Sequence, residues 1–270
     1  MVDRMRLAAI QPRVLRPESS NVERAVAYAR QAGAAGAQFA VFPECYPGPC
    51  SGPSNFSAVD PLAAVAREFA MYIGYGFMEP VEDGASTTDL FYNVYQVLGP
   101  DGAVAARYIK MIPSAVDPAL SGKRTAPGAS YALLSTPWAQ VGLLICWEAW
   151  FPELCRTLAM RGADVVLFPT GGMLGHLAPV WHTLLQARAT ENLVYTVSCV
   201  NLFGDEDGFA HVCAPEGEVA ASPREGVLVV DLDLARLRYL REQDEQLGAG
   251  HLYRTIPGLW RYNRPELYGR

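Results

Sequence analysis

The chain has 270 residues, half of them hydrophobic and 19% charged, with a formal net charge of −6 at pH 7. Such a composition is ordinary for a globular protein with a sizeable core, built as one large α/β domain or two small ones. The negative charge disfavours nonspecific binding to nucleic acid or to an anionic membrane surface. No apolar run approaches the roughly 18–20 residues of a membrane span.

The cysteine content points to the same class of protein. Six cysteines form no CxxC pair and have no zinc-type spacing with the four histidines. The apolar run before Gln11 has only four residues, too few for the core of a signal peptide. We therefore expect a cytoplasmic protein with reduced thiols, and we expect neither a metal ion nor a cofactor.

The first half of the chain alternates apolar runs with amphipathic patterns. In chain order these predict a strand at 6–10, a helix from Ser20 to the glycines at 33 and 36, a strand at 37–42, a helix from Asp60 to 70, and strands at 72–77, 93–99 and 103–109. Ser20 and Glu23 have the spacing of a capping box, and Asp60 with Pro61 fits an N-cap and a first helical residue. The GPDG turn at 99–102 predicts a hairpin.

The second half continues the alternation. It predicts a strand at 141–146, a helix at 151–162, a strand at 164–169, a helix at 179–192, and strands at 193–200 and 225–233, the last followed by an arginine-rich helix. Strands that alternate with helices, with some hairpins, indicate an α/β fold with mixed sheets. No repeat or linker divides the sequence. We therefore predict one domain over residues 1–270, with an extended tail from about Gly248.

Three polar side chains follow three of the predicted strands. Glu44 follows AQFAVFP, Lys110 follows AARYI, and Cys146 follows VGLLI. Catalytic groups of α/β proteins gather outside strand ends, so we expect these three to converge. A carboxylate can take the proton of a thiol and later return it to a leaving amine. Lys110 and the N–H of Trp147 would then donate to the oxyanion of a tetrahedral intermediate.

Several motifs together resemble the carbon–nitrogen hydrolase, or nitrilase, superfamily, in the order of that family and over almost the whole chain. They are FPECYPG, GPDGAVAARYIK, ICWEAWFPE, the PTGG at 169–172, the ARATEN at 187–192 and the NRPELYG at 263–269. The resemblance implies a four-layer α-β-β-α sandwich and a triad of Glu44, Lys110 and Cys146. It also implies hydrolysis of amides, carbamoyl groups or nitriles without a metal or cofactor, and pairing of chains through helices near the cysteine and through the C-terminal tail.

One position departs from the family pattern. The family usually has a second glutamate six residues before a Pro-Gly, and here the Pro-Gly at 127–128 places Ser121 at that position. Asp117 is the carboxylate that remains in this segment. Either Asp117 substitutes for the glutamate, or the substrate supplies the missing group, or hydrolysis is weak or altered.

Other candidates have weaker support from the sequence. Gly171, in the PTGG motif, and His176, in the loop that follows, are expected to contact the substrate or its oxyanion. Glu148 fits an acidic residue that stabilises the N-terminus of a helix. Cys45 and Cys50 are expected to be free thiols, and none of the histidines has evident metal-ligand partners.

The leading functional prediction is a hydrolase that cleaves a small linear amide or N-carbamoyl amine through a cysteine acyl-enzyme and releases ammonia or an amine. The CWE in ICWEAWFPE resembles true nitrilases, whereas AWFPE resembles amidases, so conversion of a nitrile to an acid is the alternative. Acyl transfer that forms amides uses the same acyl-enzyme and stays open. The serine at 121 leaves a fourth reading, a nitrilase-like binding protein with impaired turnover.

Overall fold

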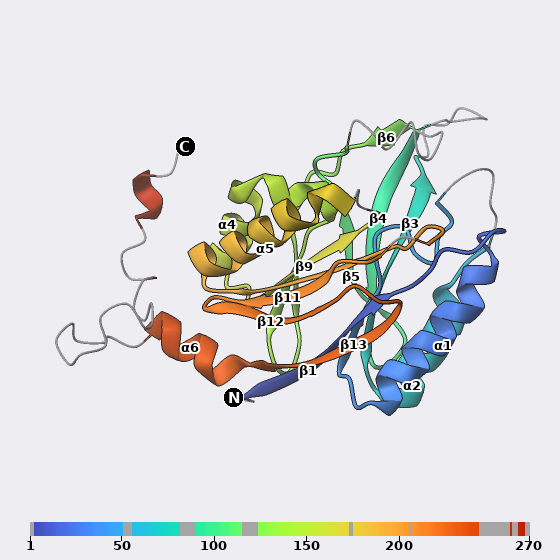
Figure 1. The fold of residues 1–270 in the computed structure, drawn as a ribbon, viewed down its shortest axis with the longest axis horizontal. Coiled ribbons are helices and arrows are strands. Elements are labelled where there is room, and N and C mark those ends of the chain that lie inside the picture. The colour runs from blue at the N-terminus through green and yellow to red at the C-terminus, as the bar shows by residue number, and fades with distance from the viewer. Residues whose placement is uncertain are drawn as a thin grey trace.

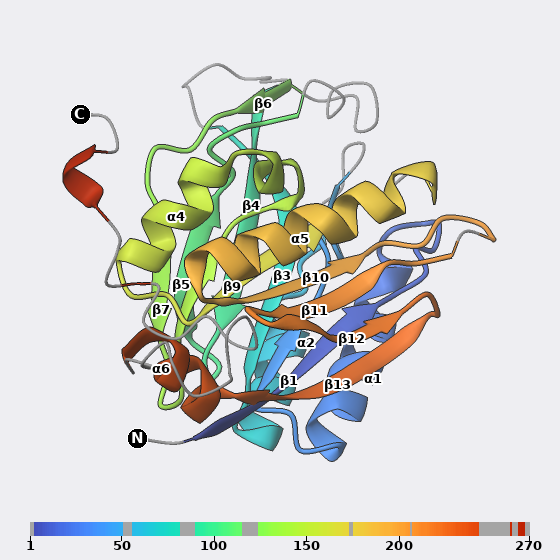
Figure 2. The same ribbon diagram turned by 60° about the vertical axis from the view of Figure 1, so that its left-hand side comes forward.

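The computed structural model describes residues 3–50, 56–81, 90–114, 124–172, 175–205, 207–242, 260 and 264–267. Two β-sheets pack face to face, and pairs of helices cover their outer faces (Figure 1). A view turned by 60° shows helix α5 (Ala178–Asn192) lying along the outer side of one of the sheets (Figure 2).

Among the described residues, helices interrupt the series of strands at several points, but many consecutive strands have no helix between them. The helices are α1 (Ser20–Ala34), α2 (Val59–Phe69), α4 (Pro152–Met160), α5 (Ala178–Asn192) and α6 (Leu234–Glu242), with 3₁₀ helices η1 (Cys146–Trp150), η2 (Gly175–Leu177) and η4 (Pro265–Leu267). The strands are β1 (Arg4–Gln11), β2 (Phe39–Val41), β3 (Tyr72–Pro80), β4 (Leu90–Leu98), β5 (Val104–Ile109), β6 (Arg124–Ala126), β7 (Ala132–Ser135), β8 (Gln140–Leu143), β9 (Val165–Thr170), β10 (Tyr195–Val200), β11 (Ala210–Ala214), β12 (Gly217–Ser222) and β13 (Gly226–Asp233).

Both sheets are mixed, as the sequence predicts. The first has the order β13-β1-β2-β3-β4-β5, with β6 paired to β4. Its central pairs β1–β2 and β2–β3 are parallel, and the predicted hairpin is confirmed as the antiparallel pair β4–β5. The second sheet has the order β12-β11-β10-β9-β8-β7, and its parallel centre is β8-β9-β10.

Strand β1 shows why the fold has four layers. Leu7 and Ala9 point into the cluster between the two sheets, whereas Ala8 and Ile10 point into a second cluster beneath α1 and α2. All four are fully buried, so a strand whose side chains alternate between faces is apolar on both. Helices α4 and α5 cover the outer face of the other sheet, and the predicted α-β-β-α sandwich is confirmed (Figure 2).

The predicted helix caps are wrong in detail. Helix α1 begins at Ser20, so its N-cap residue is Ser19 rather than Ser20, and no side chain caps it. Its first N–H groups donate instead to the carbonyl groups of Pro17, Glu18 and Ser19. Helix α2 begins at Val59, one residue before Asp60. Its N-cap is Ala58, which has no capping side chain, and the nearby Ser57 Oγ accepts from the Val59 N–H at 3.2 Å.

Two predictions about strands need correction. The strand predicted at 141–146 ends at Leu143, and Leu144 and Ile145 are buried outside the ladder of β8. Strands β6, β7, β11 and β12 were not expected, because they are short and carry few branched or aromatic side chains.

The described helices include none with the length and apolar content to cross a lipid bilayer. Most of the predicted tail from Gly248 lies outside the described residues; Trp260 and η4 are the parts that the structure places. The indole of Trp260 lies 5.6 Å from the guanidinium carbon of Arg156 in α4. The prediction of one domain over the whole chain stays a prediction.

Candidate active site

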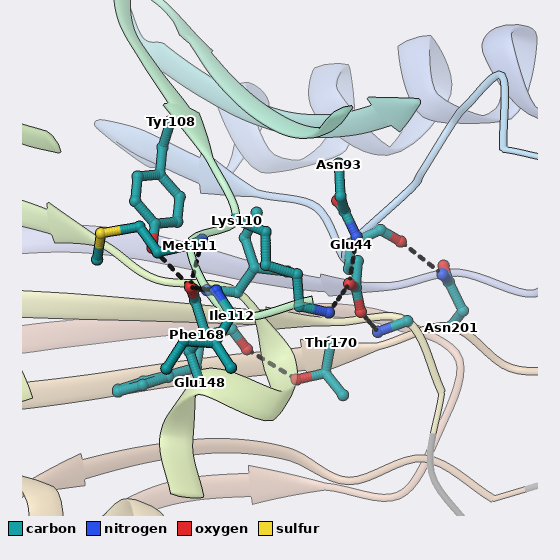
Figure 3. A network of polar contacts seen from close by, with 12 residues as sticks. Glu44, Asn93, Tyr108, Lys110, Met111, Ile112, Glu148, Phe168, Thr170 and Asn201 are labelled. Carbon is teal, nitrogen blue, oxygen red and sulfur yellow. Dashed lines mark hydrogen bonds and ion pairs between the residues drawn. The ribbon is translucent and has the colours of Figure 1, made fainter. Parts of the chain in front are cut away.

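Glu44 is the centre of a buried polar network between the two sheets. It lies just beyond β2, and its side chain is 8% exposed. Oε1 accepts from Lys110 Nζ and from Asn93 Nδ2, each at 2.7 Å, and Oε2 accepts from the N–H of Gly171 at 2.8 Å (Figure 3). Three donors from three segments therefore fix both carboxylate oxygens.

Lys110 follows the last residue of β5, and its side chain is 1% exposed. Its N–H donates to the carbonyl of Asn93 at 2.9 Å, and its carbonyl accepts from Gly128 at 2.8 Å. A Cβ on Gly128 would collide with the carbonyl of Ile109, so only glycine allows this approach. The ammonium is thus held at a buried carboxylate, which compensates for the loss of hydration of both groups.

Cys146 begins η1, where the chain turns away from β8. Its φ is +47°, a left-handed conformation that is unusual for a residue with a side chain. Burial and, after it, the negative charge of Glu44 raise the pKa of its thiol, while Lys110 and the N–H of Gly171 oppose the change, and the net result is a pKa of about 12. The structure therefore brings together the three residues predicted at strand ends, with a neutral thiol beside the carboxylate–ammonium pair.

Trp147 places its N–H in the first turn of η1, where helix N–H groups lack partners within the helix. Trp147 is 38% exposed, and its indole packs against the rings of Trp150 and Phe151. This position is compatible with the predicted donation by the backbone to an oxyanion.

Glu148 lies in the first turn of η1, in agreement with its prediction as an acidic residue at a helix N-terminus. Its side chain is fully buried and accepts four hydrogen bonds of 2.7–3.1 Å, drawn in part in Figure 3. The donors are the Tyr108 hydroxyl and the N–H groups of Met111, Ile112 and Ile145. Glu148 therefore ties the segment after Lys110 to the residue before Cys146. Burial raises the pKa of the Glu148 carboxyl, and these hydrogen bonds oppose the change.

We expect Glu148→Gln to lower the free energy of unfolding by at least about 2 kcal/mol, because the new amide group must face one of these N–H donors. Equilibrium urea unfolding measures this change. The matched control is Glu153→Gln, an exposed acid in the first turn of α4, for which we expect a change within about 0.5 kcal/mol. Equal effects of the two substitutions would contradict the role given to Glu148.

Of the other residues predicted for the site, the structure describes Gly171 and His176 but not Ser121 and Asp117. The N–H of Gly171 is engaged by Glu44, so this glycine lies in the network. His176 lies in η2 and is exposed, and its contact with a substrate stays a prediction. Ser121 and Asp117 lie outside the described residues. The replacement of the second glutamate by Asp117 or by a group of the substrate therefore stays a prediction.

Two asparagines that contact Glu44 are not among the residues predicted from the sequence. Asn93 donates to the Glu44 side chain, and Asn201 Nδ2 donates to the Glu44 carbonyl at 2.8 Å. Both are at least 95% buried. A signal did exist for each: Asn93 interrupts an apolar strand, and Asn201 directly follows another, where a buried polar side chain needs a partner.

The groups around Glu44 do not form a typical metal site, because their charged partner is an ammonium and the neighbouring donor is a neutral thiol. Among the described residues, one ligand-type cluster lies elsewhere and consists of His182, His211 and Glu218. The prediction that no histidine has such partners is therefore wrong for these two histidines. Cys45 and Cys50 are free, as predicted.

Comparison with known proteins identifies relatives over most of the chain. The model of the carbon-nitrogen hydrolase family matches residues 6–242. Omega-amidase NIT2 of Homo sapiens is 32% identical over 261 residues, which cover 88% of this chain and 92% of that protein. A carbon-nitrogen hydrolase from Helicobacter pylori G27 has the same fold, with a TM-score of 0.81 at 21% identity, over 98% of this chain and 97% of that chain.

An amidase from Nesterenkonia sp. AN1 is similar in both sequence and structure. A mutant with the acetamide moiety of fluoroacetamide added covalently at its active-site cysteine is 25% identical, with a TM-score of 0.75 over 89% of this chain and 94% of that chain. Another mutant of this amidase is in complex with butyramide and is 26% identical, with a TM-score of 0.72 over 87% and 94% of the two chains.

Proposed function

The chain belongs to the carbon–nitrogen hydrolase family, and on this premise we propose that it hydrolyses a small linear amide through an acyl-enzyme on Cys146. The observation that carries the proposal is the buried ion pair of Glu44 and Lys110, with 2.7 Å between Oε1 and Nζ, beside a thiol that starts a helix. Glu44 serves as general base and acid, and Lys110 and the N–H of Trp147 stabilise the oxyanion.

Acylation requires a proton transfer at the moment of attack, because the thiol is neutral. The Cys146 sulfur bonds to the amide carbon while Glu44 takes the thiol proton. The carbonyl electrons move onto oxygen, where Lys110 and the Trp147 N–H offset the new charge. When the carbon–nitrogen bond breaks, Glu44 returns the proton to the nitrogen, which leaves as ammonia or an amine.

Deacylation repeats these steps with water. Glu44 takes a proton from water, whose oxygen attacks the thioester carbon. The tetrahedral intermediate meets the same two donors, and the carbon–sulfur bond then breaks. The sulfur recovers a proton from Glu44, and the acid leaves. One carboxylate thus serves both halves of the reaction, which explains why its two oxygens are positioned by different segments.

We expect the Cys146 thiol to stay protonated at about pH 9, where a free cysteine, with a pKa of about 8.5, is largely ionised. The pKa of this thiol is raised to about 12, with burial as the largest cause, so the protonated form persists to higher pH than in a free cysteine. The measurement is the ultraviolet absorbance of thiolate during a pH titration, as the difference between the wild type and Cys146→Ser. A thiolate that appears below about pH 8 would contradict a mechanism in which Glu44 deprotonates a neutral thiol.

We expect Gly171→Ala to lower kcat/KM for an amide by about tenfold to a hundredfold, because its Cβ would lie 2.8 Å from Glu44 Oε2 and displace the base. Initial rates of ammonia release measure the effect. Gly175→Ala is the matched control, since a Cβ there meets no atom within 4 Å, and its rate should equal that of the wild type. An unchanged rate in Gly171→Ala would show that the position of this carboxylate does not limit the reaction.

The substrate class is supported by two relatives. One is named an omega-amidase and the other has been solved with butyramide, which is a short primary amide. We therefore propose a primary amide at the end of a short chain as the preferred substrate. An N-carbamoyl amine presents a similar carbonyl and amino group and is the second choice.

A panel of short primary amides, N-carbamoyl amines, nitriles and amines as acyl acceptors tests this proposal. Ammonia release and acid formation from the amides, faster than from the nitriles, are the expected result. Acid formed mainly from nitriles would establish the nitrilase alternative, and new amides formed with added amines would establish acyl transfer. No turnover of any member would favour an impaired binding protein.

We also propose a homodimer and a cytoplasmic location. The exposed apolar side chains Trp150, Met160 and Val180 belong to η1, α4 and α5, the helix layer next to Cys146, which supports pairing through this layer. Light scattering after gel filtration tests the dimer, and Met160→Lys should shift the equilibrium toward monomer.

The cytoplasmic location is supported by the six free cysteines, which fit a reducing compartment, and cell fractionation can test it.

A further inference from the structure

Two histidines and a glutamate meet on the outer side of the second sheet, on different elements from the Glu44 network. Nε2 of His182 and Nδ1 of His211 lie 3.2 and 3.1 Å from the same oxygen, Oε2 of Glu218. The two imidazole rings are 4.8 Å apart between centroids, and one ligand atom from each residue lies within 4.8 Å of the others. The residues come from α5, β11 and β12, and Figure 2 shows α5 on the outer side of the sheet to which the two strands belong.

A β-bulge brings Glu218 to this face of the sheet. In the antiparallel pair β11–β12, His211 is opposite Ala221 and Val212 is opposite Ala220, but Cys213 is opposite Glu218. The register therefore shifts by one residue, at Val219. Because side chains alternate between faces, a regular ladder would turn Glu218 away from His211. The bulge instead places Glu218 on the same face as His211 and Cys213.

This face is the one that α5 covers, which brings in the third residue. Ser198 lies opposite His211 in the neighbouring strand β10, and its hydroxyl accepts from the indole N–H of Trp181 in α5 at 3.1 Å. His182 is the next residue of that helix. The three side chains thus converge from two adjacent strands and the helix packed over them.

Nε2 of His182 lacks the partner that a buried nitrogen normally has. It makes almost no contact with solvent and forms no hydrogen bond within the part of the chain that the structure describes. It lies 3.2 Å from Oε2 of Glu218, yet it is not oriented to donate to that oxygen. A buried nitrogen without a hydrogen bond, within 4.8 Å of the other two ligand atoms, is suited to a metal ion that binds all three residues.

We propose that His182, His211 and Glu218 form a binding site for a divalent transition-metal ion of the Zn²⁺ type. In a tetrahedral zinc site with bonds of about 2.0–2.2 Å, neighbouring ligand atoms are about 3.3–3.6 Å apart. The two nitrogen–oxygen distances of 3.2 and 3.1 Å are slightly shorter than this, so a small outward movement of the side chains would fit the ion. Two imidazoles and one carboxylate select such an ion over Mg²⁺, which prefers oxygen ligands.

The side chains of His182 and Glu218 are 39% and 40% exposed, so an ion could reach the cluster from the surface, although Nε2 of His182 itself is buried. Within the described residues no lysine or arginine pairs with Glu218, so its charge is available to the ion. A bound ion would tie α5 to the hairpin β11–β12. The site uses none of the groups given a role in amide hydrolysis.

Calorimetric titration of the full-length, reduced protein with zinc chloride tests the proposal, with magnesium chloride as the control ion. We expect one Zn²⁺ per chain in the wild type, at least tenfold weaker binding in His182→Gln and in Glu218→Gln, and unchanged binding in His176→Gln. His176 is the matched control because it is an exposed histidine just before α5. Unfolding temperatures without metal show whether each variant is folded.

Two results would overturn the proposal: no Zn²⁺ binding by the wild type, or equal affinity in the wild type and both cluster variants. X-ray absorption of the zinc-loaded wild type gives a test that needs no variant. It should show nitrogen and oxygen ligands at about 2.0–2.2 Å, whereas sulfur at about 2.3 Å would place the ion at cysteines and contradict the site.

Discussion

Replacement of Cys146 by alanine should lower amide turnover by about 10⁴-fold or more, because no other group in the network can form the acyl intermediate. The fold should persist, since alanine is smaller than cysteine and the positive φ of 47° is already present in the native chain. Initial rates of ammonia release, together with the unfolding temperature, measure both effects.

Cys50→Ala is the matched control for this prediction. Cys50 is a free, partly buried thiol, and it belongs to the segment that follows Glu44. Its replacement should leave turnover within about twofold of the wild type, because the mechanism gives it no role. Ammonia release by folded Cys146→Ala at the rate of the wild type would exclude this cysteine as the nucleophile.

Replacement of Lys110 by methionine should affect both activity and stability. Loss of one oxyanion donor lowers kcat by about 10²–10³-fold. The substitution also leaves the Glu44 carboxylate, 8% exposed, without its cation, and breaking a buried pair in this way costs about 3–5 kcal/mol of unfolding free energy. Steady-state kinetics and urea unfolding measure the two losses.

Two further variants separate these effects. Glu44→Gln combined with Lys110→Met removes both charges, so we expect it to recover most of the stability but none of the activity. Arg107→Met is the matched control, because Arg107 is a cation of the same strand whose partner Glu79 is at the surface, and it should cost less than about 1 kcal/mol. If the double variant were no more stable than Lys110→Met, the ion pair would not be the cause of the loss.

The sequence predicts the positions of Glu44, Lys110 and Cys146 because each follows an apolar run that becomes a strand. Strands in one sheet bring their ends to a common edge, and here two sheets packed face to face bring together the ends of β2, β5 and β8. A pattern of apolar residues is enough to infer this convergence. The four layers are implied by the family resemblance instead, and the structure agrees with them, since β1 is apolar on both faces.

The sequence does not predict the partners of these three residues. Glu148 has the spacing of an ordinary helix N-terminal acid, and its burial becomes visible only when Tyr108 and Met111 are placed beside it. The register of Asn93 against Lys110 is likewise a property of the pairing between β4 and β5. Such contacts join residues far apart in the chain, and periodicity carries no information about them.

The cluster of His182, His211 and Glu218 is hidden in the sequence for a more specific reason. Counting alternate residues along β12 would put Glu218 on the wrong face, and only the bulge at Val219 corrects this. The histidines lie on elements of different type, so no fixed spacing relates them. Local irregularities of this kind are difficult to infer from composition or periodicity.

Intact-protein mass spectrometry after rapid acid quenching of the reaction with a short primary amide tests the central proposal most directly. The account predicts that the mass of the wild type increases by the acyl group minus one hydrogen, with peptide mapping to Cys146, and that Cys146→Ala shows no increase. Steady amide turnover with no adduct at any quench time, or with an adduct at another residue, would contradict an acyl-enzyme on Cys146.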